Sequence, residues 1–319
     1  MERDARPTTP QVSVILPSFN RLQFLRAAIE SVYAQTFTDW ELIIADDGSD
    51  SDTRHYLHSL ALQPRVQVIW LSHSGRPAIV RNAALRSAVG EFIAFLDSDD
   101  LWAPRKLERQ LHTLRTRARC RWSYTAFVQV DAHGDPLPEE ARRPWVPHEG
   151  EIFEQVVTGR ASIRTPSVLA TRELITQAGG FDEALQSAED YDLWVRLALL
   201  SEAAIVDEPL VLVRRHDENH TREWQSAFAG RDRSLSGRQQ LVGPERRALL
   251  RAERVSNALR LAVIHAELGD LGHSLRALWD SAPYSWTYKR WWLDGLRILL
   301  RPHVPQRLRM LYRQRRRRA

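Results

Sequence analysis

Cysteine and long apolar runs are both scarce in this sequence. Cys120 is the single cysteine among the 319 residues, so no disulfide can form within the chain. This count is unlike a secreted disulfide scaffold and fits a reducing compartment. Residues 1–10 lack the apolar core of a signal peptide, and no apolar run approaches the roughly 20 residues that span a bilayer. We therefore expect a cytoplasmic protein that does not cross a membrane.

Acidic side chains are missing from residues 301–319, which hold eight arginines instead. Without these arginines the formal net charge of +5 becomes −3, so the basic character of the chain belongs to its tail. A basic face over the whole body, as a nucleic-acid-binding protein would need, is not expected. The content of 43% hydrophobic and 27% charged residues is otherwise that of an ordinary globular protein.

Short apolar runs alternate with helical patterns over the first part of the chain. The runs are predicted to be strands, and they cover 12–16, 40–45, 66–70 and 92–96. Strands that alternate with helices in this way predict βαβ units and an α/β fold, with a mainly parallel sheet flanked by helices. Further segments are predicted to return the chain to the sheet at 122–130, 163–169 and 206–213.

Three carboxylates directly follow the run at 92–96. Asp97, Asp99 and Asp100 fall where the strand should end, and in open α/β sheets ligands bind beyond the carboxyl ends of the strands. Crowded carboxylates repel one another unless a cation neutralises them, and hard oxygen ligands suit Mg²⁺ or Mn²⁺. A metal–diphosphate site is one interpretation. The other is an acidic loop that caps the next helix, which Pro104 also favours.

A second strand end on the same rim is also acidic. The run at 40–45 breaks at Asp46-Asp47-Gly48-Ser49, where glycine permits a tight turn and Asp47 could accept hydrogen bonds from a base or ribose. A turn followed by a helix cap is the alternative interpretation. Two acidic strand ends on one rim are harder to explain by turns alone, so we expect a binding site there.

Five segments of the chain form a characteristic series of motifs. They are Val12-Ser13-Val14-Ile15-Leu16-Pro17-Ser18-Phe19-Asn20, Ser31-Val32-Tyr33-Ala34-Gln35-Thr36, Asp46-Asp47-Gly48-Ser49, Arg81-Asn82-Ala83 and Leu96-Asp97-Ser98-Asp99-Asp100. Each motif is weak alone, but in this order and spacing they resemble the family 2 glycosyltransferases, a large inverting group with the GT-A fold. The resemblance covers residues 10–216. It implies a nucleotide-sugar donor, a divalent metal ion (Mn²⁺ or Mg²⁺), and displacement with inversion at the anomeric carbon.

By position in these motifs, the resemblance assigns the residues that contact the donor. Pro17 and Phe19 correspond to residues that line the base, and Asp47 corresponds to the residue that grips it. Arg81 matches an arginine on the donor side, although it could also be an ordinary charge on a helix surface. Asp97-Ser98-Asp99 matches the DxD motif, and it is expected to contact the donor.

The metal ligands follow from the same resemblance. Asp99 is expected to coordinate the ion, together with Asp97 or Asp100. His216 follows the last predicted strand, where related enzymes often place a histidine near the metal or the diphosphate, and imidazole suits Mn²⁺ better than Mg²⁺. A lone histidine is more often structural, so that alternative stays open. Arg214 or Arg215, just before it, could pair with phosphate oxygens.

A helix is predicted to begin at Glu189, with acids in its first turn. Capping and the helix dipole alone would explain Glu189 and Asp190. An inverting transfer, however, needs a base on the face opposite the leaving group, and the family pattern assigns this role to Asp190, with Glu189 placing the acceptor. Asp182, Glu189 and Asp192 are alternative bases. A base at this position is expected to have a raised pKa.

The chain is expected to comprise a disordered segment at 1–10, a catalytic domain over 11–240 and a helical region over 241–319. Residues 217–240 are polar and are predicted to form a mobile loop over the donor. Beyond residue 244, helical spacing broken at Gly269-Asp270 predicts a helix–turn–helix that faintly resembles one tetratricopeptide unit. One such unit cannot bury its apolar face alone, so it should pack on the catalytic domain or on a partner subunit, as in a homodimer.

Tryptophans and arginines dominate the C-terminal end. Trp286, Trp291 and Trp292 precede a short apolar pattern and the eight arginines, a combination typical of segments that lie on an anionic membrane. A helix packed on the protein with a solvated basic end and an RNA-binding arm are the alternatives. We favour peripheral binding at the inner face of the plasma membrane and expect no nucleic-acid partner, because many acceptors in the resembled family are lipid-linked.

The sequence thus predicts a metal-dependent inverting glycosyltransferase. It would move a sugar from a nucleotide-sugar donor, a UDP-sugar by family frequency, to a surface glycan or its lipid-linked precursor. A nucleotidyltransferase acting on sugar phosphates is one rival, but it would need a glycine-rich basic loop where Pro17-Ser18-Phe19-Asn20-Arg21 stands. A non-catalytic module that binds membranes or RNA is the other, and retention of all the acids argues against it.

Overall fold

The chain forms two compact units in a computed structural model, one ending at residue 222 and the other beginning at residue 223. The structure describes residues 9–138, 145–216, 224–240, 242–282, 291–293 and 295. The division comes before the expected boundary after residue 240. The physical reason is that residues 224–238 are helical and pack with the helices that follow them.

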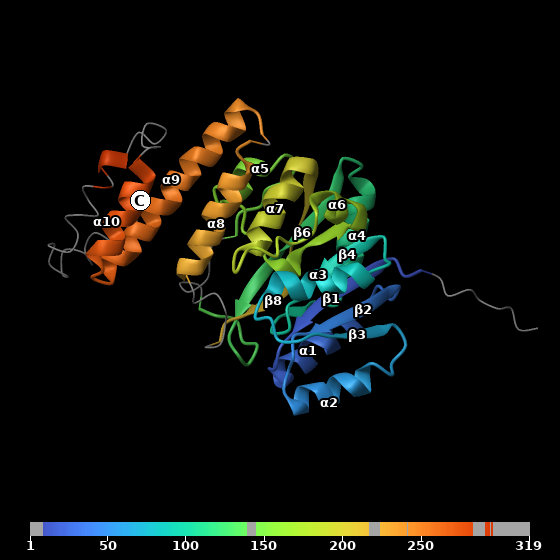
Figure 1. Ribbon diagram of the computed structural model, residues 1–319. Coiled ribbons are helices and arrows are strands. Elements are labelled where there is room, and N and C mark those ends of the chain that lie inside the picture. The colour runs from blue at the N-terminus through green and yellow to red at the C-terminus, as the bar shows by residue number, and fades with distance from the viewer. Residues whose placement is uncertain are drawn as a thin grey trace, which may run out of the picture. The chain divides into compact units, whose positions relative to one another are not determined.

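An eight-stranded sheet is the centre of the first unit (Figure 1), in the order β3-β2-β1-β4-β7-β6-β8-β5. Three stretches of alternating strand and helix precede β4, as the sequence predicts. The strands are β1 Val12–Ser18, β2 Trp40–Asp46, β3 Val66–Trp70, β4 Phe92–Phe95, β5 Leu101–Trp102, β6 Cys120–Val130, β7 Leu169–Thr171 and β8 Glu202–Arg214.

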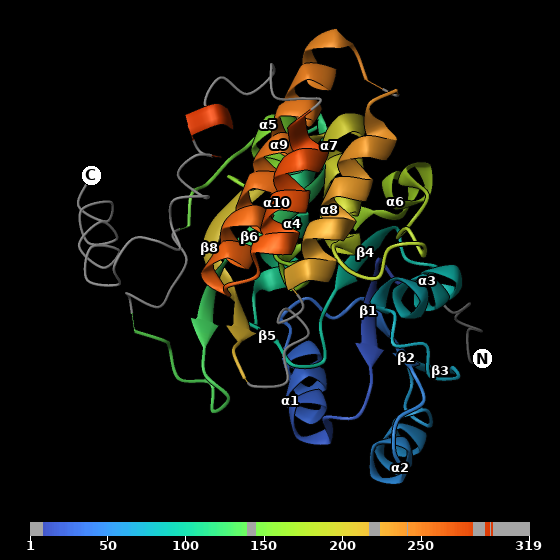
Figure 2. The same cartoon turned by 60° about the vertical axis from the view of Figure 1, so that its left-hand side comes forward.

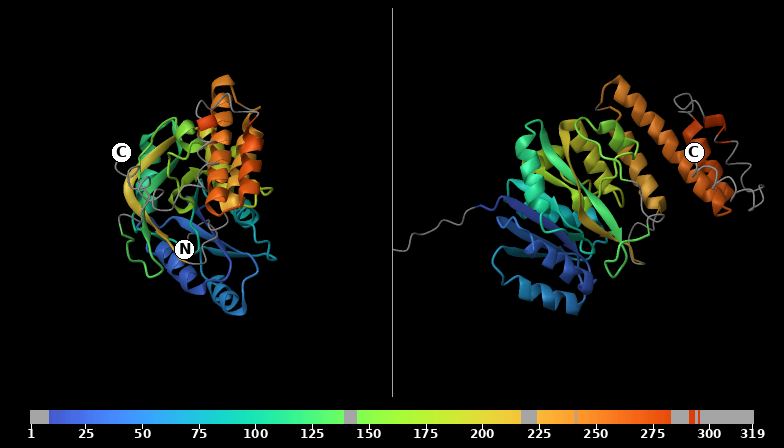
Figure 3. Two further views of the ribbon diagram at one scale, coloured as in Figure 1. Left: turned by 90° about the vertical axis from the view of Figure 1, so that its left-hand side faces the viewer. Right: turned by 180° about the vertical axis from the view of Figure 1, so that it is seen from behind.

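The half of the sheet nearest the N-terminus is parallel, which confirms that part of the expectation. β1 pairs with β2 and β4, and β2 pairs with β3, all in parallel. Figure 3 shows these blue strands of residues 12–70 side by side from behind. The other half is mixed, because β7 runs antiparallel to β4 and β6 while β8 runs parallel to β6. The carboxyl ends of β1, β2 and β4 therefore share one edge.

Helices cover both faces of this sheet. Alternate strand residues such as Val14, Leu42 and Ala94 join the apolar residues of α1, α2 and α4 in one buried cluster. The residues between them point to the other face, where Phe95 contacts the rings of Phe181 and Trp194. The helices are α1 Leu22–Tyr33, α2 Ser51–Leu60, α3 Pro77–Ser87, α4 Lys106–Thr116, α5 Phe153–Val157, α6 Arg172–Ala178 and α7 Glu189–Leu200, with a 3₁₀ helix, η2, at Thr165–Ser167.

β8 is irregular at Pro209. Its register against β6 shifts between Thr125 and Phe127, where Pro209 pairs with Ala126. Proline lacks the amide donor that a regular ladder needs, so a bulge forms at that point. Beyond the bulge the strand continues to Arg214, which brings the segment at 214–216 back to the end of β4.

The second unit is helical. It contains α8 Trp224–Arg238, α9 Pro244–Glu267 and α10 Leu271–Ser281, and Figure 2 shows α9 and α10 side by side. Apolar residues of α9 and α10 form a small core that includes Val255, Ala262 and Ala277. α8 corrects the loop predicted over 217–240 for the described part of that segment. It is held to α9 by Arg254, which bonds Asp232 at 2.8 and 3.1 Å.

The predicted membrane segment lies mostly outside the described residues, including Trp286 and the eight arginines. Of its described members, Trp291 is buried in the core of the second unit and donates from Nε1 to Ser281 Oγ at 2.9 Å, whereas Trp292 is 73% exposed. Among the described helices, none is both long enough and apolar enough to span a bilayer.

Candidate active site

The turn after β2 is built around Asp46 and Gly48. Asp46 is fully buried and accepts hydrogen bonds from the amide and the hydroxyl of Ser49, which closes the turn. Gly48 has a φ of 78°, and a Cβ there would lie 2.9 Å from the backbone nitrogen of His73. A glycine is needed because the backbone is left-handed and another chain segment approaches closely. The turn interpretation is therefore correct for Asp46.

Asp47 has a different role from its neighbour. Its Oδ1 accepts from the amide and hydroxyl of Ser74, at 2.8 and 2.9 Å, and its Oδ2 accepts from Gly75 N at 2.9 Å. His73 Nδ1 lies 3.1 Å from the same Oδ2, and its ring stacks on Phe19 with centroids 4.2 Å apart. Asp47 thus orders the 73–75 loop beside Phe19.

Two residues near the end of β1, Pro17 and Phe19, lie beside Asp47. Pro17 is half-buried near the end of β1, and Phe19, just after it, is 36% exposed. An exposed ring stacked on an imidazole presents a flat apolar surface, which suits a planar base. The structure therefore brings Pro17, Phe19 and Asp47 together at one edge of the sheet, and their contact with a base stays a prediction.

Arg81 is the centre of a buried ion-pair chain. From α3 it donates to Asp97 Oδ1 at 2.7 Å and to Glu189 Oε1 at 2.7 Å, with its side chain only 8% exposed. Its guanidinium also lies over the ring of Phe181, 5.4 Å from the centroid. The alternative of an ordinary surface charge is therefore wrong. Arg81 joins the end of β4 to the start of α7.

The charges in this chain shift one another's pKa. Burial opposes the charge on Arg81, but Asp97 and Glu189 more than offset it, so the net pKa is raised. Burial raises the pKa of Asp97, against the pull of Arg81 and with help from the charge of Asp99. Glu189 follows the same pattern, with burial raising its pKa more than Arg81 lowers it.

Asp99 lies at the other side of the turn that follows β4. Its Oδ2 accepts from Arg21 at 3.1 Å and lies 3.0 Å from Nε2 of His216. Burial alone would raise the pKa of Asp99, but the His216 hydrogen bond and the charge of Arg21 lower it. The imidazole packs against Phe24 with centroids 4.8 Å apart. His216 therefore lies beside Asp99, and its role as a metal ligand stays a prediction.

Asp100 serves the fold at this point. It is buried, and its Oδ1 accepts from the amide of Arg214 at 2.8 Å, which fastens the end of β8 to the turn. Burial first, and then the charges of Asp99 and Asp97, raise its pKa well above the ordinary value. Ser98 is half-buried within the same turn, which Asp100 closes by donating its amide to the Asp97 carbonyl at 3.1 Å.

Of the four predicted metal ligands, only two are well placed to bind a divalent ion. Asp99 and His216 are in direct contact and offer a carboxylate and an imidazole, which together suit Mn²⁺. Asp97, in contrast, faces Arg81, and Asp100 faces the backbone of Arg214. A Mn²⁺ or Mg²⁺ ion that takes part of its shell from phosphates needs only one or two carboxylates, so the residues present fit such an ion.

Asp190 is the most available acid of the α7 end. It is half-buried, its Oδ1 accepts from Tyr191 N at 2.6 Å, and Thr165 donates to its Oδ2 at 3.3 Å. Asp192 is fully buried and paired with Arg196 at 2.6 Å, and Asp182 accepts from the amide of Ala184 at 2.9 Å. Those two alternative bases therefore have structural roles.

Sequence reasoning missed several residues of the site. Arg21 and Asn20 both have left-handed backbones, with φ of 58° and 54°, and Arg21 reaches Asp99. Asn82 uses its side-chain amide to hold the backbone of Phe181 at 2.8 and 2.9 Å. Their positions within the Phe19-Asn20-Arg21 and Arg81-Asn82-Ala83 segments could have identified these residues. No sequence pattern identifies Thr165, because its partner Asp190 is distant in sequence.

Comparison with known proteins agrees with this arrangement of elements. Residues 13–156 match the family model described as "Glycosyl transferase family 2". A relative from Rickettsia felis, named "Uncharacterized glycosyltransferase", is 33% identical over 64% of this chain and 33% of its own length. WfgD of Escherichia coli, a UDP-Glc:alpha-D-GlcNAc-diphosphoundecaprenol beta-1,3-glucosyltransferase, is 42% identical over 31% of this chain and 39% of its own length. The chain thus spans about a third of the length of these curated relatives.

Solved structures share the fold at low identity. TarS 1–349 of S. aureus in complex with UDP-GlcNAc has a TM-score of 0.59 at 18% identity, over 84% of this chain and 90% of that one. The mannosyltransferase PcManGT of Pyrobaculum calidifontis, in complex with GDP-Man and Mn²⁺, has a TM-score of 0.59 at 17% identity, over 92% and 88%. At such identities the likeness establishes the fold alone.

Proposed function

We propose that this protein is a metal-dependent inverting glycosyltransferase, because residues 13–156 match the family model described as "Glycosyl transferase family 2" and the first unit shares its fold with solved glycosyltransferase structures. It moves one sugar from a nucleotide-sugar donor to a glycan or lipid-linked acceptor in surface polysaccharide synthesis. The observation that carries the proposal is the meeting of Asp99, His216 and the Arg81 ion-pair chain at one edge of the sheet.

The donor is a UDP-sugar in this proposal. The base stacks on Phe19 beside Pro17. Asp47 accepts a hydrogen bond from the polar edge of the base, in place of one hydrogen bond that it accepts from the 73–75 loop. Two relatives support the nucleotide, because TarS was solved with UDP-GlcNAc and WfgD is named for UDP-Glc. PcManGT was solved with GDP-Man, so the experiment below must determine which nucleotide base this protein binds.

The metal site consists of Asp99 and His216, with Asp97 and Asp100 beside them. A bound Mn²⁺ or Mg²⁺ ion would act as a Lewis acid that neutralises the negative charge of the departing diphosphate. Asp99 suits this role because its lowered pKa keeps it ionised. Arg81 holds the turn that contains Asp97 and Ser98 through its hydrogen bond to Asp97.

Asp190 is the general base in this proposal. It removes the proton from the acceptor hydroxyl as the hydroxyl attacks the anomeric carbon, opposite the bond to phosphate, so the configuration inverts. Thr165 and the Tyr191 amide orient its two oxygens. Glu189 is held by Arg81 and places the acceptor beside the base. This division of roles follows from the tight pairing of Glu189 and the greater exposure of Asp190.

The acceptor is lipid-linked in this proposal, and the protein works as a peripheral protein at the inner face of the plasma membrane. WfgD, whose name specifies a diphosphoundecaprenol acceptor, supports this choice. The arginine-rich segment at 301–319 supplies the attraction to anionic lipid. We assign catalysis to the first unit and acceptor or membrane contact to the helical unit.

Mn²⁺-dependent donor binding and hydrolysis test the proposal. UDP-, GDP- and other nucleotide sugars are titrated with and without Mn²⁺, and release of the nucleoside diphosphate is then followed. We expect a UDP-sugar to bind only when Mn²⁺ is present and to be hydrolysed slowly without acceptor. The same measurements on Asp99→Ala test the metal assignment, since unchanged activity in that variant would show that the ligand is elsewhere.

A further inference from the structure

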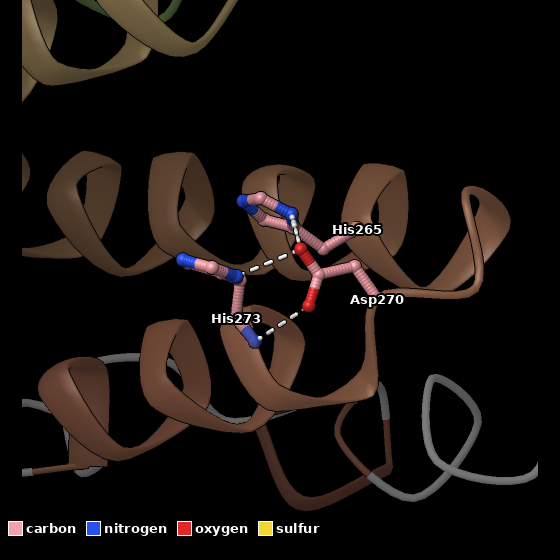
Figure 4. Close-up of side chains that lie close together, drawn as sticks. All are labelled: His265, Asp270 and His273. Carbon is pink, nitrogen blue, oxygen red and sulfur yellow. Dashed lines mark hydrogen bonds and ion pairs between the residues drawn. The ribbon is translucent and has the colours of Figure 1, made fainter.

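The turn between α9 and α10 gathers three potential metal ligands that the site described above does not use. His265 is in the last turn of α9, Asp270 precedes α10, and His273 is in the first turn of α10 (Figure 4). One ligand atom from each residue lies within 4.8 Å of the other two. Among the described residues this is the cluster of three histidine or carboxylate donors closest to the geometry of a metal site.

The three side chains converge on one oxygen. Nδ1 of His273 lies 2.7 Å from Asp270 Oδ2, and Nδ1 of His265 lies 3.4 Å from the same atom. The two imidazole rings stack with centroids 5.0 Å apart and planes 18° apart. Figure 4 shows both Nδ1 atoms directed toward the carboxylate. Two ring nitrogens and a carboxylate oxygen are therefore already close together.

Local structure fixes this arrangement. Gly269 has a φ of 81° and ends α9, which lets Asp270 N donate to the carbonyl of His265 at 2.9 Å. Asp270 Oδ1 caps α10 by accepting from His273 N at 3.1 Å, so Oδ2 is left to face the imidazoles. Capping explains one oxygen of Asp270 and leaves the convergence of two histidines on the other oxygen unaccounted for.

We propose that His265, Asp270 and His273 bind a divalent transition-metal ion, Zn²⁺ in the first instance, with water completing the shell. Imidazole nitrogen and carboxylate oxygen are both common zinc ligands, and three protein ligands plus water make a tetrahedral site. The site joins the two helices of the hairpin, so the ion stabilises the second unit. Its three residues belong to the second unit, whereas the residues of the donor site belong to the first.

The mobility of the ligands suits this role. The His265 side chain is 7% exposed and so is fixed in place, whereas that of His273 is 64% exposed and can turn. Stacked rings cannot both aim a lone pair at one ion, so His273 rotates when the metal binds. Mg²⁺ prefers an octahedral set of oxygens, so this nitrogen-rich set discriminates against it.

Zn²⁺ and Co²⁺ titrations of the full chain test the proposal, by calorimetry for Zn²⁺ and by the visible spectrum for Co²⁺. We expect one site outside the donor centre, with the spectrum of four-coordinate Co²⁺. His273→Gln and Asp270→Asn should each weaken Zn²⁺ binding at this site at least tenfold. Asp270→Asn keeps the helix cap, because asparagine caps as well as aspartate, so a fold defect does not explain its result.

Two controls assign the outcome. His216→Gln, in the donor site, should leave Zn²⁺ binding to the hairpin and the four-coordinate Co²⁺ bands of the hairpin unchanged, and Zn²⁺ should raise the Tm of the wild type but not of His273→Gln. Equal Zn²⁺ affinity in the wild type, His273→Gln and Asp270→Asn would overturn the proposal. So would the absence of any Zn²⁺ bound outside the donor centre, which would leave Asp270 as a cap only.

Discussion

At the scale of single residues, Arg81 is the key to the site. It is nearly buried, and it neutralises two carboxylates that come from different elements, Asp97 at the end of β4 and Glu189 at the start of α7. An uncompensated buried charge costs several kcal/mol, so the arginine favours the ionised form of both carboxylates. One guanidinium therefore joins the end of β4 to the start of α7.

Replacing Arg81 by methionine should damage both stability and activity. The change leaves Asp97 and Glu189 without their cation, so we expect a loss of about 3–5 kcal/mol in the free energy of unfolding and loss of sugar transfer. Chemical denaturation and initial rates measure the two effects. Adding Glu189→Gln to the variant should restore part of the stability but not the activity. No gain in stability would contradict the ion-pair chain.

Asp190 and Asp192 offer a matched pair for the general base. Asp190→Asn removes a proton acceptor, so we expect kcat to fall about 10²–10⁴-fold while the Kd of the donor stays constant. Asp192→Asn breaks the pair with Arg196, which anchors the carbonyls of residues 178 and 180, so we expect mainly a lower Tm. The reverse pattern would assign the base to Asp192.

Lys106 predicts an unusual pH dependence of stability. Its amine is fully buried, lies 4.0 Å from the centroid of the Trp102 ring, and has no hydrogen-bond partner among the described residues. Burial lowers its pKa well below the ordinary value. The unfolded chain therefore binds a proton that the folded chain lacks, and Lys106 destabilises the fold increasingly as the pH falls from about 10.4 toward the lowered pKa.

Lys106→Met should therefore be more stable than the wild type at neutral pH. We expect a gain on the order of 1–2 kcal/mol, or a few degrees in Tm, because the unpaired buried amine is removed. The advantage should shrink as the pH rises toward about 10.4. Thermal unfolding at several pH values measures it, with Arg105→Met as an exposed control. An advantage independent of pH would point to packing instead.

At the scale of elements, the turn after β2 strongly favours glycine at position 48. Gly48 combines a left-handed φ of 78° with a backbone contact that a Cβ would bring to 2.9 Å, whereas Gly134 has a φ of 96° and nothing within 4 Å of a built Cβ. Gly134→Ala should cost about 1 kcal/mol of backbone strain. Gly48→Ala should cost about twice that or more, because His73 must also move.

Displacement of His73 should also weaken the donor site. We expect Gly48→Ala to raise the Kd for the nucleotide, since the His73 ring stacks on Phe19, and Gly134→Ala to leave it unchanged. Denaturation and nucleotide titration of the two variants separate strain from the contact. Equal effects of the two substitutions would show that only the φ angle matters.

Elements differed in how well local sequence predicted them. The parallel strands β1 to β4 have apolar runs that end at turn signals, so their existence follows from the residues themselves. α8 was missed because its apolar residues do not share one face, and its stability comes from packing on α9. β7, with three residues, is too short for a periodic pattern, and it is a strand because β4 and β6 lie on either side.

At the scale of the whole molecule, the two compact units suggest separate responses to ligands. The donor-site residues lie in the first unit, and the His265 cluster lies in the second. UDP with Mn²⁺ should slow amide hydrogen exchange at 73–81, 97–100 and 214–216, because ligand binding to the folded state opposes local opening. Peptides of α9 and α10 should keep their exchange rates. Equal protection of both units by the nucleotide would refute separate sites.

The sequence by itself determined the fold class and the positions of the carboxylates at the ends of strands. Asp47 and Asp97 follow strands, and the carboxyl ends of parallel strands meet at one edge, so their proximity follows from local patterns and topology. Only the tertiary structure decided which charges pair. Arg81 meets Glu189 across 108 residues and His216 meets Asp99 across 117. Such contacts depend on how α3 and α7 pack on the sheet and on where β8 joins it. No local preference encodes that arrangement.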